Sequence, residues 1–308
     1  MVESGLTLSL FRKGTALPES TAPIFDEARL AIGDRADGPT MLEEIGRAQK
    51  GAYDSMLFIR GEEPVGLICC ESVDDDARLT FGHVLRSFSS KKAAVFNMAV
   101  DALVDKQFKV IRSNLTWPEP EGFSETAVAM GFVVVDRLSM VIEGDPGRTT
   151  GPLPHGTEIV RWSPEYFDDV ARTMCETADP MDRVVYPQYQ THEGCKAMLR
   201  NILENKYGEF LPRQSFIALS GGRFAGYLLS ILLPDGTILI VDIAVDPAFR
   251  RSGIGGAMID SIVGGSDKKR IYLAVTTSNR EAESLYRSKG FRVETAVRQH
   301  ILAPGRGK

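Results

Sequence analysis

The chain of 308 residues is about twice the usual domain size, so we expect two domains. Its hydrophobic content of 43% is that of an ordinary globular protein, and no apolar run is long enough for a membrane helix. The net charge of −5 argues against a nucleic-acid binder that depends on an overall positive charge.

The N-terminal half predicts alternating strands and helices. Its first residues, MVESGLTLSLFRKG, carry an acidic residue where a signal peptide would be basic, so we expect a cytoplasmic protein with no membrane partner. A strand over 6–14 precedes two helical segments at about 20–32 and 40–50. Three β-rich runs, a helix at about 91–106, a fourth β-rich run, a short helical stretch and the strand FVVVDRLSMVIE complete this half.

A segment rich in Gly, Pro and Thr, EGDPGRTTGPLPHG, follows at residues 143–156. Such a composition is typical of a linker between domains. We therefore predict a first domain over 1–145, a linker over 146–157 and a second domain over 158–308.

The C-terminal half repeats the same order of elements. The strand TEIVRW leads to a helix that begins near Ser163-Pro164, where serine caps the helix and proline occupies its first turn. A helix at about 192–206 precedes two β-rich runs that are joined by a Gly-Gly turn. The strand TILIVDIAV, a glycine-rich segment with a helix, the strand IYLAV, a helix near 279–289 and the strand FRVETAVRQHIL close the chain.

Residues of the same type recur at a near-constant spacing in the two halves. The matching pairs, 159 or 160 residues apart, are Ser55 and Ser215, Gly66 and Gly226, Asp101 and Asp260, Gly131 and Gly290, and Phe132 and Phe291. We interpret this register as the duplication of one α/β unit.

Neither the cysteines nor the histidines have the spacing of a metal site. The cysteines are Cys69, Cys70, Cys175 and Cys195, none of which forms a C-x-x-C pair, and the four histidines stand far apart. We expect no metal.

The most informative stretch is VDIAVDPAFRRSGIGGAMIDSIV, residues 241–263. A buried strand ends at Val245, and a basic, glycine-rich turn over 250–256 then opens a helix. The first N–H groups of a helix lack partners and its dipole is positive there, so the turn predicts a site for a pyrophosphate. A Rossmann fingerprint would need Gly or Ala where Met258 stands, and the Gly-Lys-Ser/Thr end of a P-loop is absent.

The turn resembles the acetyl-CoA signature Q/R-x-x-G-x-G/A of the GNAT superfamily of N-acetyltransferases. The residues that carry the resemblance are Arg250-Arg251-Ser252-Gly253-Ile254-Gly255, the preceding Ile243-Ala244-Val245-Asp246-Pro247, and the later Asn279, Tyr286 and Gly290-Phe291. The resemblance covers residues 158–301 and, more faintly, 6–142. It implies an α/β fold of two tandem domains, each with a mixed, splayed central sheet flanked by helices.

The resemblance also implies direct acetyl transfer from acetyl-CoA to a primary amine. Tyr286 would be the general acid, Asn279 would bind the cofactor arm or a water, and an N–H of the strand before the turn would polarise the thioester carbonyl. The residues that it assigns to acetyl-CoA are Ile243, Ala244, Val245, Arg250, Arg251, Ser252, Gly253, Ile254, Gly255, Gly256, Ala257, Asn279, Ala282 and Tyr286. Taken alone, Tyr286 would more often be a core aromatic than an acid.

The acceptor side is less well defined by the sequence. Asp242 and Glu209 are the candidates for the general base, although hydrogen bonding into the structure would explain Asp242 in an apolar strand equally well. The segment 179–194 overhangs the acceptor site in the family, and a solvated loop that packs its tyrosines is the alternative reading. Its candidate substrate residues are Asp179, Asp182, Arg183, Tyr186 and Tyr189.

The first half departs from the family pattern at the chemistry-bearing positions. The basic pair persists as Lys91 and Lys92, but the residues that replace Gly253, Gly255, Asn279 and Tyr286 are Ala94, Phe96, Pro120 and Ala127. We therefore expect this domain to be catalytically silent, with a role in packing or acceptor recognition. The resulting internal pseudo-dimer favours a monomer.

These features predict an acetyl-CoA-dependent N-acetyltransferase without metal. The tandem layout is similar to that of mycothiol synthase, and the motif also resembles ribosomal-protein N-acetyltransferases. The acceptor is thus a small molecule or a peptide amine, either a protein lysine or an N-terminus. The alternative of another class is a non-enzymatic acyl-CoA-binding or sensing module, against which the presence of Tyr286 and Asn279 argues.

Overall fold

The computed structural model describes residues 5–33, 38–73, 75–115, 117–151, 153–267 and 269–303. The chain divides into two compact units. Unit 1 comprises residues 1–135 and 298–308, and unit 2 comprises residues 136–297. No helix among the described residues is both long and apolar enough to cross a membrane.

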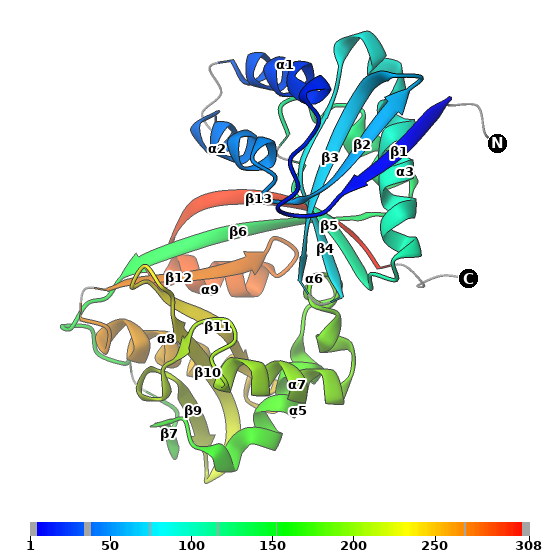
Figure 1. The fold of residues 1–308 in the computed structure, drawn as a ribbon. Coiled ribbons are helices and arrows are strands. Elements are labelled where there is room, and N and C mark those ends of the chain that lie inside the picture. Colours follow the sequence, from blue (N-terminus) through cyan, green and yellow to red (C-terminus); the bar gives the residue numbers. More distant parts are fainter. Residues whose placement is uncertain are drawn as a thin grey trace. The chain divides into compact units, whose positions relative to one another are not determined.

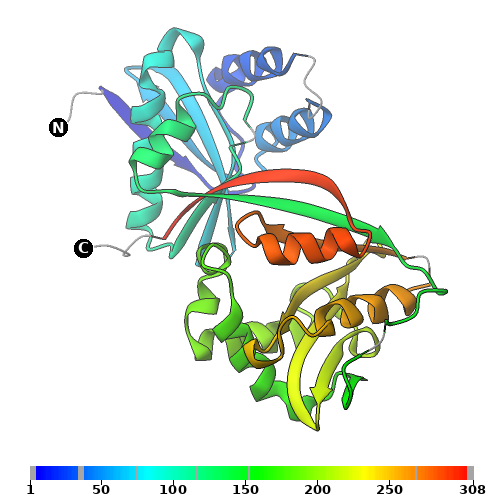
Figure 2. The same cartoon turned by 180° about the vertical axis from the view of Figure 1, so that it is seen from behind.

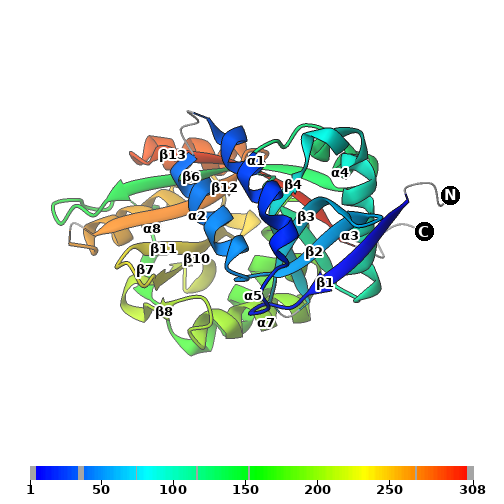
Figure 3. The same cartoon turned by 45° about the horizontal axis from the view of Figure 1, so that its top comes forward.

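Unit 1 is a mixed sheet with helices on both faces (Figure 1). Its elements are β1 (Leu6–Phe11), η1 (Glu19–Thr21), α1 (Ala22–Ile32), α2 (Gly38–Gln49), β2 (Asp54–Arg60), β3 (Glu63–Val73), β4 (Asp76–Val84), η2 (Arg86–Lys91), α3 (Lys92–Asp105), β5 (Val110–Ser113) and α4 (Phe123–Ala129). The strand order is β1-β2-β3-β4-β5, antiparallel except for the parallel pair β4 and β5 that α3 connects. Helices α1 and α2 lie next to each other on one face of this sheet (Figure 3).

Unit 2 has the same plan. Its elements are β7 (Thr157–Arg161), η3 (Pro164–Tyr166), α5 (Phe167–Thr177), α6 (Asp182–Val185), η4 (Pro187–Gln190), α7 (His192–Leu203), β8 (Glu209–Phe210), η5 (Pro212–Gln214), β9 (Phe216–Ser220), β10 (Arg223–Leu232), β11 (Ile238–Val245), η6 (Pro247–Phe249), α8 (Ile254–Gly264), β12 (Arg270–Thr276) and α9 (Arg280–Ser288). Helices α8 and α9 cover one face of the sheet and α5 and α7 the other (Figure 2). Along β10, Leu228 packs into the α8 and α9 core, whereas Tyr227 and Leu229 pack into the α5 and α7 core, as strand alternation requires.

Two long strands belong partly to each unit. β6 (Val133–Glu143) enters unit 2 at Asp136 and pairs there with β12, and β13 (Arg292–Leu302) re-enters unit 1 at Arg298 and pairs there with β5. The sheet order in unit 2 is therefore β6-β12-β11-β10-β9-β7. The compact units follow strand pairing rather than the two halves of the sequence repeat.

The order of helices and strands in the structure agrees with the sequence analysis, and the predicted fold class is confirmed. The repeat also places its glycines alike. A Cβ added at Gly66 of β3 would lie 2.9 Å from the carbonyl oxygen of His83, and one at Gly226 of β10 would lie 2.7 Å from that of Ala244. Each glycine therefore permits the same close approach of the neighbouring strand.

In both units the parallel strand pair separates before its strands end. β11 pairs with β12 only at Ile238 and Leu239, although β11 continues to Val245. In unit 1, β4 pairs with β5 only as far as Leu79. Residues 241–245 of β11 are all partly exposed, whereas residues 81–84 of β4 are all buried. The predicted splay is present in both units, but only in unit 2 is the strand end partly open.

Asp260 of α8 is a buried anion that holds two cations. Its carboxylate side chain is 6% exposed and accepts hydrogen bonds from Arg148 Nε at 2.8 Å and from Lys289 Nζ at 2.5 Å. Arg148 also donates to the carbonyl oxygen of Lys289. The carboxylate thus ties the segment after β6 to both α8 and the end of α9.

We predict that Asp260→Asn destabilises the protein by about 1.5–3 kcal/mol, because two cations lose a buried negative partner. Asp101→Asn changes the matching position of the repeat, where the side chain is exposed, and is the matched control. Thermal unfolding should show a lower midpoint, by several degrees, for the Asp260 variant alone. Equal midpoints for the two variants would contradict the role of the buried ion pairs.

Candidate active site

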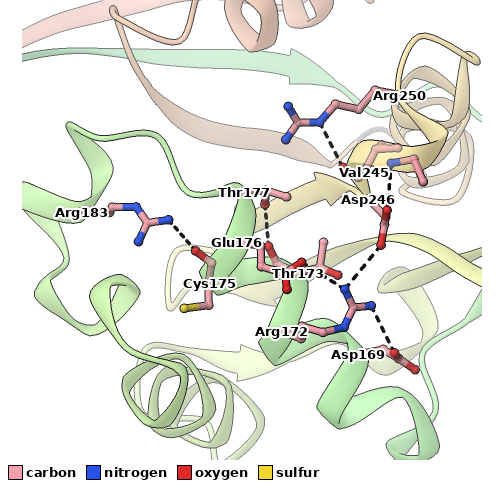
Figure 4. Close-up of polar contacts among 11 residues, drawn as sticks. Asp169, Arg172, Thr173, Cys175, Glu176, Thr177, Arg183, Val245, Asp246 and Arg250 are labelled. Atoms are coloured by element: carbon pink, nitrogen blue, oxygen red, sulfur yellow. Dashed lines mark hydrogen bonds and ion pairs between the residues drawn. The ribbon is translucent and has the colours of Figure 1, made fainter.

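The turn that follows β11 is anchored to α5. Asp246 accepts a hydrogen bond from the backbone N–H of Ala248 at 2.9 Å and pairs with Arg172 of α5 at 3.5 Å. Figure 4 shows Arg172 between Asp169 and Asp246, with Arg250 directed at the carbonyl oxygen of Val245. These contacts fix the direction in which the chain leaves the open end of β11.

The glycine-rich segment then forms the start of α8. Gly253 caps this helix in the left-handed conformation, with φ 86°, and Arg251 before it has φ 62°. Within α8 the backbone N–H of Ala257 donates to the carbonyl oxygen of the cap residue Gly253 at 3.0 Å. The amides before it lie in the first turn, where helical N–H groups have no intrahelical acceptor. The exposed side chains of Arg250 and Arg251 add positive charge at this helix start.

Close packing surrounds the second glycine of the motif. A Cβ at Gly255 would lie 3.3 Å from Leu285 Cδ2 of α9 and 3.6 Å from Val245 Cγ2 of β11. At Gly256 a Cβ would lie 2.8 Å from Lys289 Cε. A larger side chain at Gly255 would therefore displace α8 from the end of β11 or from α9.

Asp242 of β11 lies within a small tyrosine cluster. Its Oδ2 accepts hydrogen bonds from the hydroxyl of Tyr227 at 2.8 Å and from that of Tyr189 at 3.4 Å. Burial raises the pKa of Asp242 to about 6, helped by the charge of Asp182, while the Tyr227 bond and the amide of Ile243 oppose the rise. A carboxylate with such a pKa accepts protons near neutral pH.

Asp182 of α6 is the second carboxylate of this cluster. Thr276, the last residue of β12, donates its hydroxyl hydrogen bond to Asp182 at 2.5 Å. Burial raises the pKa of Asp182, whereas the Thr276 bond and the charge of Arg137 lower it. Asp242 belongs to β11, and Asp182 is hydrogen-bonded to Thr276 at the end of β12. The two carboxylates thus lie on either side of the place where the two strands part.

Tyr286 of α9 is 7% exposed and packs against Phe291, with ring centroids 5.9 Å apart. Burial raises the pKa of Tyr286, and the charges of Asp242 and Asp182 add to this shift. The phenol therefore keeps its proton at physiological pH. It is a core aromatic whose protonated hydroxyl feels the charges of both carboxylates.

Other residues of the predicted site have structural partners. Asn279 caps α9 by accepting the N–H of Ala282 at 3.2 Å. Asp179 accepts hydrogen bonds from the hydroxyl of Ser278 and from the N–H of Met181, both at 2.8 Å. These two side chains shape the loops beside the carboxylate pair.

Arg183 is engaged within its own loop. Its guanidinium donates to the carbonyl oxygens of Cys175, Ala178 and Tyr189, the first of which is visible in Figure 4. Three backbone acceptors account for its orientation, so it acts as a brace of the 178–189 segment.

Glu209 lies apart from this cluster. It is an exposed residue of β8 that pairs with Leu232 of β10, whereas Asp242 stands opposite Leu229. Three residues of strand separate these levels by roughly 10 Å, on opposite sides of β10. The structure does not bring the two candidate bases together.

Three residues of the cluster are not among those predicted from the sequence: Tyr227, Thr276 and Arg137. Arg137 of β6 donates to the hydroxyl of Tyr186 at 2.9 Å, and Tyr186 in turn packs against Tyr189. A polar or charged residue within an otherwise apolar strand, as at Asp242, was the sequence signal that could have identified them. For Arg137 the signal was obscured, because sequence order assigned it to the first domain.

Part of the chain is similar to known proteins. Residues 174–291 match the acetyltransferase (GNAT) family. Over 89 residues the chain is 30% identical to the ribosomal protein bS18-alanine N-acetyltransferase of Escherichia coli (strain K12), which corresponds to 28% of this chain. The chain spans 60% of the length of that relative.

Two solved structures share the fold. A GCN5-related N-acetyltransferase from Sphaerobacter thermophilus is similar over 98% of this chain and 96% of that chain, with a TM-score of 0.52 and 16% identity. A functionally unknown conserved protein from Staphylococcus epidermidis is similar over 77% of this chain and 90% of that chain, with a TM-score of 0.56 and 13% identity. At such identities the likeness concerns the fold alone.

The raised pKa of Asp242 predicts a pH-dependent stability. The folded chain holds this proton more tightly than the unfolded one, so the stabilising contribution is complete below the ordinary value of 3.8. It is lost as the pH rises through about 6. The side chain of Asp242→Asn cannot ionise. The melting midpoint of this variant should therefore rise relative to that of the wild type as the pH increases from about 4.5 to 7.

Thermal melts of both proteins across this range test the expectation, with Asp101→Asn as a control that should stay parallel to the wild type. A constant difference between the wild type and the Asp242 variant would show that the carboxyl does not titrate in this window.

Proposed function

We propose that unit 2 transfers an acetyl group from acetyl-CoA to a primary amine, because residues 174–291 match the acetyltransferase (GNAT) family. One observation carries this proposal: the partly exposed end of β11, released from β12, leads directly into the glycine-rich start of α8. An extended strand edge and an electropositive helix start in series fit a long ligand that ends in a pyrophosphate.

In this proposal the helix start binds the pyrophosphate of acetyl-CoA. The amides of residues 252–256 and the exposed guanidinium groups of Arg250 and Arg251 are the donors. The thioester arm follows the open edge of β11 at residues 243–245, where ladder pairing with β12 has ended. A backbone N–H of this edge polarises the thioester carbonyl.

The carboxylate and the phenol divide the proton chemistry. Asp242 takes a proton from the acceptor ammonium, and the free amine then attacks the carbonyl carbon of the thioester. As the C–S bond breaks, the nitrogen releases its second proton and the sulfur leaves with the bonding electron pair. Tyr286 donates a hydrogen bond to this sulfur. Of the two protons that leave the nitrogen, one neutralises the CoA thiolate and the other is released to solvent.

We propose that unit 1 performs no such chemistry. Val84 pairs with Gly66, and Val245 pairs with the matching Gly226 of the repeat. Phe81 lies three residues before Val84, as Asp242 lies three residues before Val245, so Phe81 occupies the position in unit 1 that matches Asp242. A Cβ at Gly82 would lie 2.4 Å from the ring of Trp117. Aromatic side chains thus occupy the region where β4 leaves β5, so we expect one acetyl-CoA per chain.

We predict that Gly255→Val abolishes binding of acetyl-CoA, because the added isopropyl group crowds Leu285 and Val245 and shifts the helix start. Isothermal titration calorimetry should give one site per chain for the wild type and none for the variant. Gly46→Val, at a helical glycine of unit 1 with open space around it, is the control and should bind as the wild type does. Unchanged affinity of the Gly255 variant would refute the phosphate site.

We predict that Tyr286→Phe lowers turnover by about a hundredfold while acetyl-CoA affinity is largely retained, since the ring stays packed and only the donor is lost. Tyr207→Phe, at an exposed tyrosine, is the control. The measurement is the release of free CoA thiol under conditions where chemistry limits the rate. A Tyr286 variant with the turnover of the control would remove this residue from the mechanism.

A further inference from the structure

Arg137 is placed beside the carboxylate cluster by strand register. It lies on β6 directly opposite Thr276 of β12, and paired residues of an antiparallel ladder project to the same face. Thr276 uses that face to hold Asp182. Arg137 therefore stands next to the gap that Asp182 and Asp242 flank.

The Arg137 guanidinium has hydrogen-bond donors that are not used within the described part of the protein. Its Nη1 donates to the Tyr186 hydroxyl, and the group lies over the Tyr186 ring at 5.3 Å from the centroid. Within the described ranges, its Nε is buried without a hydrogen-bond partner and no carboxylate oxygen forms an ion pair with it. Asp182 acts on its charge from a distance, but that carboxylate is committed to Thr276.

A partly buried cation without a direct anionic partner is costly unless a ligand supplies the anion. The planar guanidinium fork matches a carboxylate, which it binds through two parallel hydrogen bonds. The same cluster carries Asp242, a carboxyl group that would attract a cationic amine. The site therefore has complementary charges for a molecule with both groups.

Resting on the acetyl transfer proposed above, we propose that Arg137 binds a carboxylate of the acceptor, which is a small amino acid-like molecule with a primary amine. The amine faces Asp242 and the carboxylate faces Arg137, so the residue sets acceptor specificity without touching the acetyl donor. A peptide with its amine far from any carboxylate would leave Arg137 unpartnered.

The test compares matched acceptors with the full-length wild-type enzyme. α-Amino acids, β-alanine and γ-aminobutyrate are each offered beside their carboxamides, together with C-terminally amidated peptides, and release of CoA thiol is followed. We expect kcat/KM to be about 10- to 100-fold higher for the best acids than for their amides, since a charge-assisted bond is lost. Equal rates for acids and amides, preference for the amidated peptides, or no transfer to any carboxylate would overturn the inference.

Arg137→Gln supplies the second arm. We expect a higher KM for the acid, an unchanged KM for acetyl-CoA and the loss of discrimination between acid and amide. Arg78→Gln, at an exposed strand arginine, is the control with wild-type kinetics. If the Arg137 variant does not fold, the wild-type comparison of acids and amides still decides. Calorimetry with acetyl-CoA separates the two proposals, because binding without acid preference refutes Arg137 alone, whereas absent binding refutes the acetyl transfer itself.

Discussion

The structure depends on one constraint, the separation of β11 from β12 after Leu239. Two parallel strands that part leave a stretch of backbone without ladder partners, which a fold tolerates only where water, side chains or a ligand satisfy those groups. The separation also brings together groups from several elements: Asp242 on β11, Thr276 with Asp182 at the end of β12, and Tyr286 from α9. On the other side of β11, Gly226 lets β10 approach the strand end closely and so supports its open edge.

The same separation has opposite outcomes in the two units. In unit 1 the end of β4 is buried, Phe81 stacks on Phe25 with centroids 5.9 Å apart, and Trp117 packs against Phe123 with centroids 4.8 Å apart. Aromatic packing of this kind favours stability. In unit 2 the corresponding region keeps two carboxylates whose burial raises their pKa values. Thus, where the strands part, one unit has stabilising aromatic packing and the other retains costly ionisable groups, as functional sites often do.

Sequence patterns predicted local features well and non-local ones poorly. The glycine-rich start of α8 was predictable, because Gly253 and its neighbours determine their own backbone conformation. The hydrogen bonds of Asp242 were foreseen only as an alternative, since its partners Tyr227 and Tyr189 come from other elements. Glu209 had the right chemistry, but the pairing of β8 with the far end of β10 separates it from the cluster. Arg183 had the right position in the chain, but the backbone carbonyls of its own loop take up its donors.

The exchange of strands between the units changes what the N-terminal half contributes. The part of β6 from Arg137 to Glu143 belongs to unit 2 and pairs with β12, so the strand that ends the first copy of the repeat borders the carboxylate cluster of the second. Arg137 lies outside residues 174–291, the part that matches the acetyltransferase family. If Arg137 selects the acceptor, then the first copy retains an influence on the reaction through a single strand, although aromatic rings pack around the end of its own strand β4.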